Sequence, residues 1–255
     1  MLDQSTSSGV SAAETEARID LAAAIRLVSL FGWDDVTLAH LSARSPDNPD
    51  HMLLHGPQYF FDDVQASNLH LLDRNAEHVR PQDDMPHKFA FPFHREIYDA
   101  FPKANAIIHV HTKAVCAVAM QKQGLIPGNQ YAMWLGPIGY HDYPGMLSSP
   151  EIGADLVNSF GDGQIVLQRG HGVAIWAPTQ REAFVLAYTF NRACEAQIMS
   201  GVGEGGIEAY VPPNDVLGAT VQQARAITDG EQMWSKVCWE GWKRKIARSA
   251  PDYCH

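Results

Sequence analysis

The sequence lacks the long apolar runs of a membrane-spanning chain. Among its 255 residues, none of the hydrophobic stretches approaches the roughly 20 residues that a transmembrane helix needs. The first 18 residues contain neither the basic segment nor the apolar segment of a secretory signal peptide. We therefore expect no membrane contact and a cytoplasmic location.

Positive charge and paired cysteines are also scarce. Nineteen lysines and arginines stand against 29 aspartates and glutamates, and no basic stripe of the kind that binds phosphate backbones is present. We therefore expect no nucleic-acid partner. The four cysteines show no paired spacing, and Cys116 and Cys194 fall among apolar residues, as small buried hydrophobes do. The chain is rich instead in hydrophobic residues, at 45%, which is enough to bury the core of one domain.

A pair of histidines is the most informative feature that the chain does contain. The segment 106–118, AIIHVHTKAVCAV, places His109 and His111 two residues apart in a β-type run. Successive side chains of a strand point to opposite faces, so both imidazoles project to one side. They supply half of a tetrahedral metal site, and catalytic sites usually add a third protein ligand and leave one position open. Two histidines that are only hydrogen-bonded on a half-buried strand are the alternative.

A third histidine lies in a tight turn. In the segment 165–183, IVLQRGHGVAIWAPTQREA, two apolar strands flank a turn in which Gly170 and Gly172 enclose His171. Glycine permits a sharply bent backbone and leaves the side chain between the two glycines exposed. His171 is therefore a candidate ligand or catalytic group, and an ordinary polar turn residue is the alternative.

Hydrophobic periodicity predicts the remaining elements. We expect helices over 14–31, 89–101, 112–124, 151–160, 181–200 and 216–248. We expect short strands within 36–64, and a long irregular connection over 125–150, of a length that is usually functional in compact domains.

Together these segments resemble the class II aldolase/adducin family, over roughly residues 15–210. The matching features are His109-Val-His111, His171-Gly172, the spacing of 60 positions from His111 to His171, the F-H-x-x-I-Y run at 93–98, and Ser-Ala-Arg at 42–44. The resemblance implies an α/β fold, a three-layer α/β/α sandwich with a mainly antiparallel central sheet. It also implies a divalent metal held by His109, His111 and His171, and a cyclic oligomer, commonly a homotetramer, with active sites near subunit boundaries.

The resemblance divides the chain into a metal-binding domain, residues 1–215, and a helical tail, residues 216–255, that serves as an interface or lid. Trp234, Trp239 and Trp242 exceed what one small helix usually exposes, and large exposed apolar patches mark interfaces. We expect a homotetramer in which the tail packs on a neighbour or across the mouth of its site. A tail packed only on its own domain is the alternative.

The chain departs from the sugar-phosphate aldolases of this family at positions that carry their chemistry. Their catalytic glutamate, four residues before the equivalent of His94, is Ala90 here. Their phosphate-binding Ser/Thr-Gly turn becomes LLHGPQ, with Gln58 in place of the glycine, and their Ser-Ser pair becomes MPHK. The asparagine of their G-N-x-S-x-R motif is His40. The resemblance therefore implies that the aldolase base is lost and that a phosphorylated sugar is not the substrate.

A metal ion held by three neutral histidines is a strong Lewis acid, because no carboxylate ligand dilutes its charge. It can chelate a 2-oxo or hydroxy-carboxylate and absorb the charge of the enolate that decarboxylation or retro-aldol cleavage generates. We therefore predict a metal-dependent carbon–carbon lyase, of decarboxylase or aldolase type, for a small unphosphorylated hydroxy- or oxo-carboxylate. Zinc is the first expectation for the metal, and manganese or iron also suits imidazole ligands. Some relatives resemble this description, being decarboxylases of hydroxylated aromatic acids.

Further candidate site residues lie in segments that the resemblance places near the pocket. One of His94, His141 and His40 is the expected proton donor. Arg44 and His55 are the expected substrate-binding residues, since an arginine can clamp a carboxylate with two hydrogen bonds. Each has an ordinary alternative: a core histidine for His94, a loop residue for His141 and a structural ion pair for Arg44.

Two other classes of function remain open. Some relatives are non-haem iron oxygenases of aromatic 2-oxo acids, and an all-histidine site could hold Fe(II). The adducin head is a non-catalytic scaffold domain whose animal members lack the metal histidines, so His109, His111 and His171 argue against it. Zinc or manganese in the purified protein favours the lyase, iron with oxygen uptake favours the oxygenase, and no metal favours the scaffold.

Overall fold

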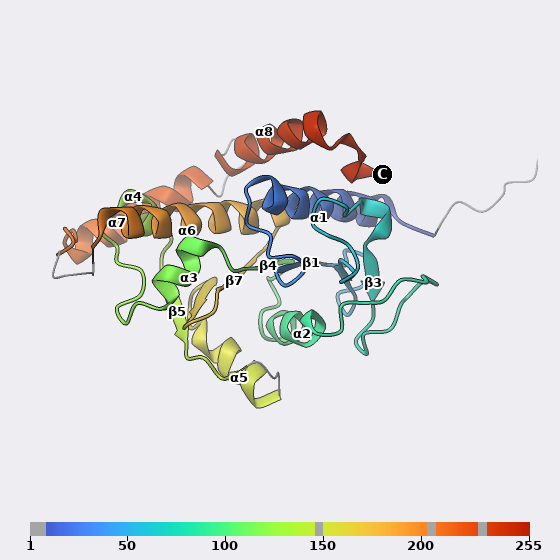
Figure 1. The fold of residues 1–255 in the computed structure, drawn as a ribbon, viewed down its shortest axis with the longest axis horizontal. Helices are drawn as coiled ribbons and strands as arrows, with labels where there is room; N and C mark the ends of the chain where they lie inside the picture. The colour runs from blue at the N-terminus through green and yellow to red at the C-terminus, as the bar shows by residue number, and fades with distance from the viewer. Residues whose placement is uncertain (1–8, 146–149, 203–207, 229–233) are drawn as a thin grey trace, which may run out of the picture.

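The computed structural model describes residues 9–145, 150–202, 208–228 and 234–255. These residues form a single seven-stranded sheet with helices on both of its faces (Figure 1). The strands are β1 His40–Arg44, β2 Met52–Leu54, β3 His70–Leu72, β4 Ala106–Val110, β5 Ile138–His141, β6 Ile165–Gln168 and β7 Val173–Ala177. The helices are α1 Ala12–Leu30, η1 Ala66–Asn68, α2 Ala90–Ala100, α3 Lys113–Ala119, α4 Gln130–Trp134, α5 Pro150–Ser159, α6 Gln180–Ser200, α7 Asn214–Thr228, α8 Trp234–Ser249 and η2 Pro251–Cys254.

The sheet has the strand order β3-β2-β1-β4-β7-β6-β5. Every neighbouring pair is antiparallel except β5 and β6, which are parallel. The central strand β4 sets His109 opposite His40 of β1 and opposite Ala174 of β7. Residues directly opposite each other in a sheet point to the same face, so His40 and His109 share one face.

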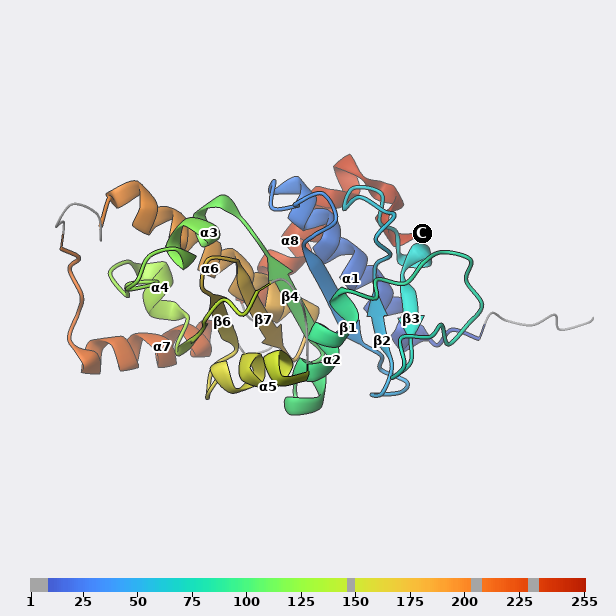
Figure 2. The ribbon, with the colours of Figure 1, turned by 60° about the horizontal axis from the view of Figure 1, so that its bottom comes forward.

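Helices cover both faces of the sheet, which confirms the predicted three-layer α/β/α fold. α1 and α6 lie on one face, and α2 and α5 lie on the other (Figure 1, Figure 2). Alternate residues of β4 therefore enter different cores: Ile108 packs on the α1/α6 side and Ile107 on the α2/α5 side. Burial on both faces explains why this strand is almost entirely apolar. No helix within the described ranges is long and apolar enough to cross a membrane.

The region expected to be an irregular connection contains regular structure. Residues 125–150 include α4 and β5, and the predicted strands of 36–64 are followed by β3, which was not predicted. β5 has the sequence IGYH and gains its partner by parallel pairing with β6, a long-range contact that no local pattern indicates. Residues 146–149 of this connection lie outside the described part of the chain.

Two of the tail tryptophans pack against side chains of the same chain, as the alternative expectation had it, and the packing of the tail on a neighbour stays a prediction. The Trp239 ring lies 6.1 Å from that of Phe184, and the Trp242 ring lies 5.1 Å from it. The indole Nε1 of Trp239 donates to Asp20 of α1 at 3.3 Å. α8 therefore covers α1 and α6, on the side away from α2 and α5 (Figure 1). A homotetramer remains a prediction, without support from these side chains.

Candidate metal centre and active site

The three predicted metal ligands converge at one end of β4. His109 is the fourth residue of that strand, His111 follows its end, and His171 occupies the turn between β6 and β7. One ligand nitrogen from each ring lies within 4.8 Å of the other two. The ring centroids are 4.5 to 5.0 Å apart. Three imidazoles at this spacing fit the ligand set of a catalytic divalent metal site with one position open.

Hydrogen bonds on the outer side of these rings decide which nitrogens face inward. His109 Nδ1 donates to the carbonyl oxygen of Val173 at 3.0 Å, and His111 Nδ1 lies 3.3 Å from the Asp35 carboxylate. Both acceptors require a proton on Nδ1, so a neutral ring carries its lone pair on Nε2. The two Nε2 atoms face each other at 2.7 Å.

Two facing lone pairs need a cation or a proton between them. Burial holds the pKa of His109 well below its usual value. Burial also lowers the pKa of His111, although Asp35 opposes that shift. A shared proton is therefore disfavoured, and a divalent ion fits the donor set better.

The tight turn brings His171 close to its partners because Gly172 has no side chain. A Cβ at Gly172 would lie 2.5 Å from a ring carbon of His111 and 2.6 Å from the carbonyl oxygen of Val110. The thiol of Cys116, on α3, donates to the carbonyl oxygen of His171 at 2.9 Å. The turn is therefore held against both β4 and α3.

A second group of histidines extends from the metal centre toward β2. The His40 ring stacks on the His109 ring, with 4.6 Å between the ring centroids. The ring centroid of His87 lies 5.9 Å from that of His40 and 5.4 Å from that of His55. Within the described residues, Nε2 of His55 and Nε2 of His87 are buried without a hydrogen-bond partner. Burial lowers the pKa of His55 to about 3 and also lowers that of His87, so both rings are neutral near pH 7. His87 was not predicted as a site residue. Its segment, MPHK, was interpreted only as the place where the Ser-Ser pair of the sugar-phosphate aldolases is absent.

The other two candidate proton donors lie in different surroundings. His94 is fully buried between Ser42 and His40, at 2.7 Å from each, so it acts on the site only through His40. His141 pairs with Gln168 across β5 and β6. Nε2 of His141 and the side-chain oxygen of Gln168 are buried and, among the described residues, unpartnered.

Arg44 does not face the metal centre, which corrects its expected role as a carboxylate anchor. It lies at the opposite end of β1 from His40. Each guanidinium nitrogen donates to a backbone carbonyl; the acceptors are Ala104 at 2.8 Å, Tyr98 at 2.7 Å, Pro49 at 3.1 Å and Phe101 at 3.3 Å. The arginine thus holds β1 against the segments on either side of it.

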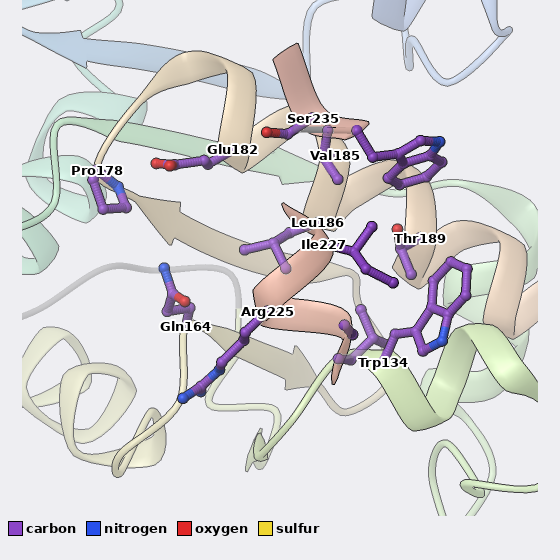
Figure 3. A pocket seen from close by; sticks show the side chains of 13 residues that line it. Trp134, Gln164, Pro178, Glu182, Val185, Leu186, Thr189, Arg225, Ile227 and Ser235 are labelled. Carbon is purple, nitrogen blue, oxygen red and sulfur yellow. The ribbon is translucent and has the colours of Figure 1, made fainter. Parts of the chain in front are cut away.

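A separate cavity of about 380 Å³ lies between α4, α6, α7 and α8 (Figure 3). Trp134, Leu186 and Ile227 contribute apolar walls, and Glu182 and Arg225 contribute charge at its edge (Figure 3). The metal-site histidines do not line this cavity.

Comparison with known proteins identifies the family. The profile of the Class II Aldolase and Adducin N-terminal domain matches residues 19–198. A solved aldolase II superfamily protein from Pseudomonas syringae is 31% identical, with a TM-score of 0.90, over 97% of this chain and 98% of that one. Human gamma-adducin is 32% identical over 75% of this chain and 28% of its own length.

A fold-level likeness extends to an enzyme. The L-fuculose 1-phosphate aldolase from Glaciozyma antarctica has a TM-score of 0.81 at 17% identity, over 98% of this chain and 96% of that one. At this identity the likeness shows the shared fold alone. The profile match and the Pseudomonas syringae relative show more: the chain belongs to the class II aldolase and adducin family.

Proposed function

We propose that this protein is a metal-dependent carbon–carbon lyase for a small, unphosphorylated hydroxy- or oxo-carboxylate. The observation that carries the proposal is the convergence of His109, His111 and His171, with two Nε2 atoms facing each other at 2.7 Å. Zinc is the proposed metal, and manganese or iron also suits three imidazoles. A bound divalent ion supplies a Lewis acid that polarises a carbonyl or carboxylate oxygen.

The neighbouring histidines suit a substrate with carbonyl or carboxylate oxygens. The Ala90 N–H donates to His87 Nδ1, so the buried Nε2 of neutral His87 carries the proton and can donate to a substrate oxygen. His55 Nδ1 donates to the Gly56 carbonyl, so the buried Nε2 of His55 carries a lone pair and can accept from a substrate hydroxyl. A phosphate dianion would find little positive charge there to balance its own. The Phe93 ring, 5.1 Å from His40 and 4.9 Å from His109, adds a flat apolar wall that excludes water and favours a planar substrate.

His141 is the proposed proton acceptor on the β5 side. The Ser159 hydroxyl donates to the carbonyl oxygen of Asp155 at 2.7 Å, so its oxygen accepts a hydrogen bond from His141 Nδ1 at 3.2 Å. That leaves the lone pair of His141 on Nε2, the buried atom without a partner. A proton taken up at this atom can be returned to the substrate carbon after cleavage.

A non-catalytic scaffold is the second candidate, favoured by the match to human gamma-adducin. An iron oxygenase of the same fold is the third. Metal analysis of the purified protein separates them, because a scaffold requires no bound metal and an oxygenase requires iron and consumes oxygen. A homotetramer and a cytoplasmic location complete the proposal, and light scattering that shows a monomer would contradict the tetramer.

The decisive experiment is a substrate screen on metal-analysed protein. Hydroxy- and oxo-acids are incubated with the protein, and release of carbon dioxide or an aldehyde is measured with and without a chelator. We expect turnover that the chelator and the His109→Ala variant abolish and that the His51→Ala variant retains, since the side chain of His51 hydrogen-bonds to the loop residue Asn48. Efficient cleavage of a sugar phosphate, or turnover that survives in His109→Ala, would overturn the proposal.

A further inference from the structure

A line of hydrogen bonds runs through the core next to the metal centre, from Tyr98 to His40. The Tyr98 hydroxyl lies 2.8 Å from Ser42 Oγ, Ser42 Oγ lies 2.7 Å from His94 Nδ1, and His94 Nε2 lies 2.7 Å from His40 Nδ1. Tyr98, Ser42 and His94 are almost completely buried. Each of these hydrogen bonds needs one donor and one acceptor, so the position of the proton in one bond constrains its position in the next.

That direction is set at the Tyr98 end of the line. Among the described residues, Ser42 Oγ is the only hydrogen-bond partner of the Tyr98 hydroxyl. If the hydroxyl only accepted, its own proton would be buried without an acceptor, which native structures avoid. Burial also raises the pKa of Tyr98, so the phenol stays protonated. Tyr98 therefore donates to Ser42.

Each following group then has one arrangement left. Ser42 has a single hydroxyl proton and already accepts from Tyr98, so it donates to His94 Nδ1. His94 consequently carries its proton on Nε2 and donates to His40 Nδ1. Because His40 Nδ1 accepts this hydrogen bond, it carries no proton of its own. The one proton of the His40 ring is then on Nε2.

We propose that Tyr98, Ser42 and His94 are positioning residues that fix His40 as a hydrogen-bond donor, presenting Nε2–H to a substrate oxygen beside the metal centre. The His40 ring stacks on that of His109, which places it next to the proposed metal ligands. A fixed donor selects substrates with an acceptor oxygen at this point, such as a carboxylate or carbonyl group. The substrate role rests on the proposed function, whereas the position of the proton does not.

His141 provides an internal reference, because the same argument gives the opposite result there. Its Nδ1 donates to Ser159 Oγ, whose own proton goes to Asp155. The protein should therefore contain a neutral histidine protonated on Nε2, His40, and one protonated on Nδ1, His141.

Nuclear magnetic resonance distinguishes the two forms directly. We would record long-range proton–nitrogen correlations of the full chain, loaded with zinc and labelled with nitrogen-15 in its histidines, near pH 7. His40→Gln and His141→Gln variants assign the signals. We expect His40 to be protonated on Nε2 with at least about a tenfold excess, which corresponds to the usual cost of one unpaired buried polar group. A His40 ring protonated on Nδ1 would overturn the proposal.

Two variants test the line itself. Ser42→Ala removes the hydroxyl that donates to His94 Nδ1, so His94 is free to reverse and both forms of His40 should appear in comparable amounts. Tyr98→Phe keeps the ring and leaves the Ser42 hydroxyl with His94 as its remaining partner in the line, so Ser42 should still donate to His94 and His40 should stay protonated on Nε2. Tyr140→Phe, which removes a tyrosine hydroxyl bound to the Leu125 carbonyl instead, should leave the His40 signals unchanged. A His40 tautomer unaffected by Ser42→Ala, or reversed by Tyr98→Phe, would refute the line. Failure of the substrate screen would leave this result standing.

Discussion

Two regions of the molecule differ in kind: one has a cavity with apolar walls, and the other has a group of histidine side chains. The cavity between α4, α6, α7 and α8 encloses about 380 Å³, a volume in the range of small-molecule sites. Trp134, Leu186 and Ile227 give it walls that are largely apolar. The group of histidines that extends from the candidate metal centre toward β2 instead holds buried ring nitrogens that have no hydrogen-bond partner among the described residues, those of His55 and His87.

The difference shows that buried polar atoms without partners indicate a reactive site better than the volume of a cavity does. Apolar walls lose little when a cavity stays dry, so room alone requires no ligand. A buried nitrogen without a partner loses a hydrogen bond, and native structures rarely tolerate this without a water, an ion or a substrate to complete it. Substitutions in the two regions should therefore separate cleanly, and the following predictions are ordered from the largest effect to the smallest.

The largest effect should come from removing a metal ligand. His109→Ala should weaken metal binding by more than about 100-fold, beyond the range seen for residues that only orient a ligand. The measurement is metal content by mass spectrometry after dialysis. Leu186→Ala, in the cavity (Figure 3), should keep the wild-type content. Full metal content in His109→Ala, or metal loss in both variants, would erase the distinction between the regions.

Gly172→Ala should destabilise the fold by about 3 kcal/mol, at the upper end for overpacking, because the new Cβ meets a His111 ring carbon at 2.5 Å and the Val110 carbonyl at 2.6 Å. Chemical denaturation measures the change. Gly170→Ala is the matched control: it meets no atom within 4 Å, although its φ of +63° costs an alanine about 1 kcal/mol. Equal losses in both variants would show that backbone conformation matters there and the close approach does not.

The third prediction concerns stability in acid. Burial lowers the pKa of His55 to about 3 in the folded state, against 6.5 for an unperturbed histidine. Between these values the unfolded chain binds a proton that the folded one does not. The contribution of neutral His55 to the free energy of unfolding is therefore fully present above pH 6.5. It is lost as the pH drops toward 3, by up to about 1.4 kcal/mol per pH unit.

The His55→Gln variant removes this proton-binding group. Between pH 6.0 and 4.5 it should lose about 2 kcal/mol less than the wild type, measured by denaturant titration at each pH. Leu186→Ala removes no such group and should keep the wild-type slope. A His55→Gln slope equal to that of the wild type would show that His55 is not held neutral by its surroundings.

The smallest effect should come from Asp35, which orients His111 from outside the triad. Asp35→Asn should weaken metal binding about tenfold, the lower end for such residues, because the carboxylate is partly exposed. A metal-buffer titration measures the change. Asp34→Asn removes the same charge from the neighbouring, exposed position and should change affinity less. Equal effects would mean that net charge near the site matters and the hydrogen bond does not.

The sequence was sufficient where one local rule placed a side chain. The two-residue period of a strand put His109 and His111 on one face, and the glycines around His171 predicted its tight turn. The role of Arg44 was predicted wrongly, and the packing of the tail tryptophans within the chain was only the alternative expectation, for a shared reason. Their residue types suit a ligand or an interface, whereas the carbonyls around Arg44 and the Phe184 ring against Trp239 come from distant parts of the chain.

The residues that orient the site could not be predicted, because their roles exist only between elements. The Asp35 carboxylate, in the loop after α1, contacts His111 just after the end of β4. Ser42 of β1 hydrogen-bonds to Tyr98 of α2. His87 becomes part of the histidine group only because its ring approaches that of His40. Local patterns fix the direction of a side chain along its own element. They do not fix which neighbour it meets.

The separation of His111 from His171 along the chain has a consequence for folding. Fifty-nine residues lie between these two proposed ligands, and the pairing of β4 with β7 closes that loop. Such long-range closure is a slow step in folding, so a complete metal centre forms only once the middle of the sheet has assembled. An ion that binds the assembled sheet and not the unfolded chain raises the melting temperature as its free concentration rises. Binding of the metal ion to a molecule would then show that the sheet of that molecule has finished folding.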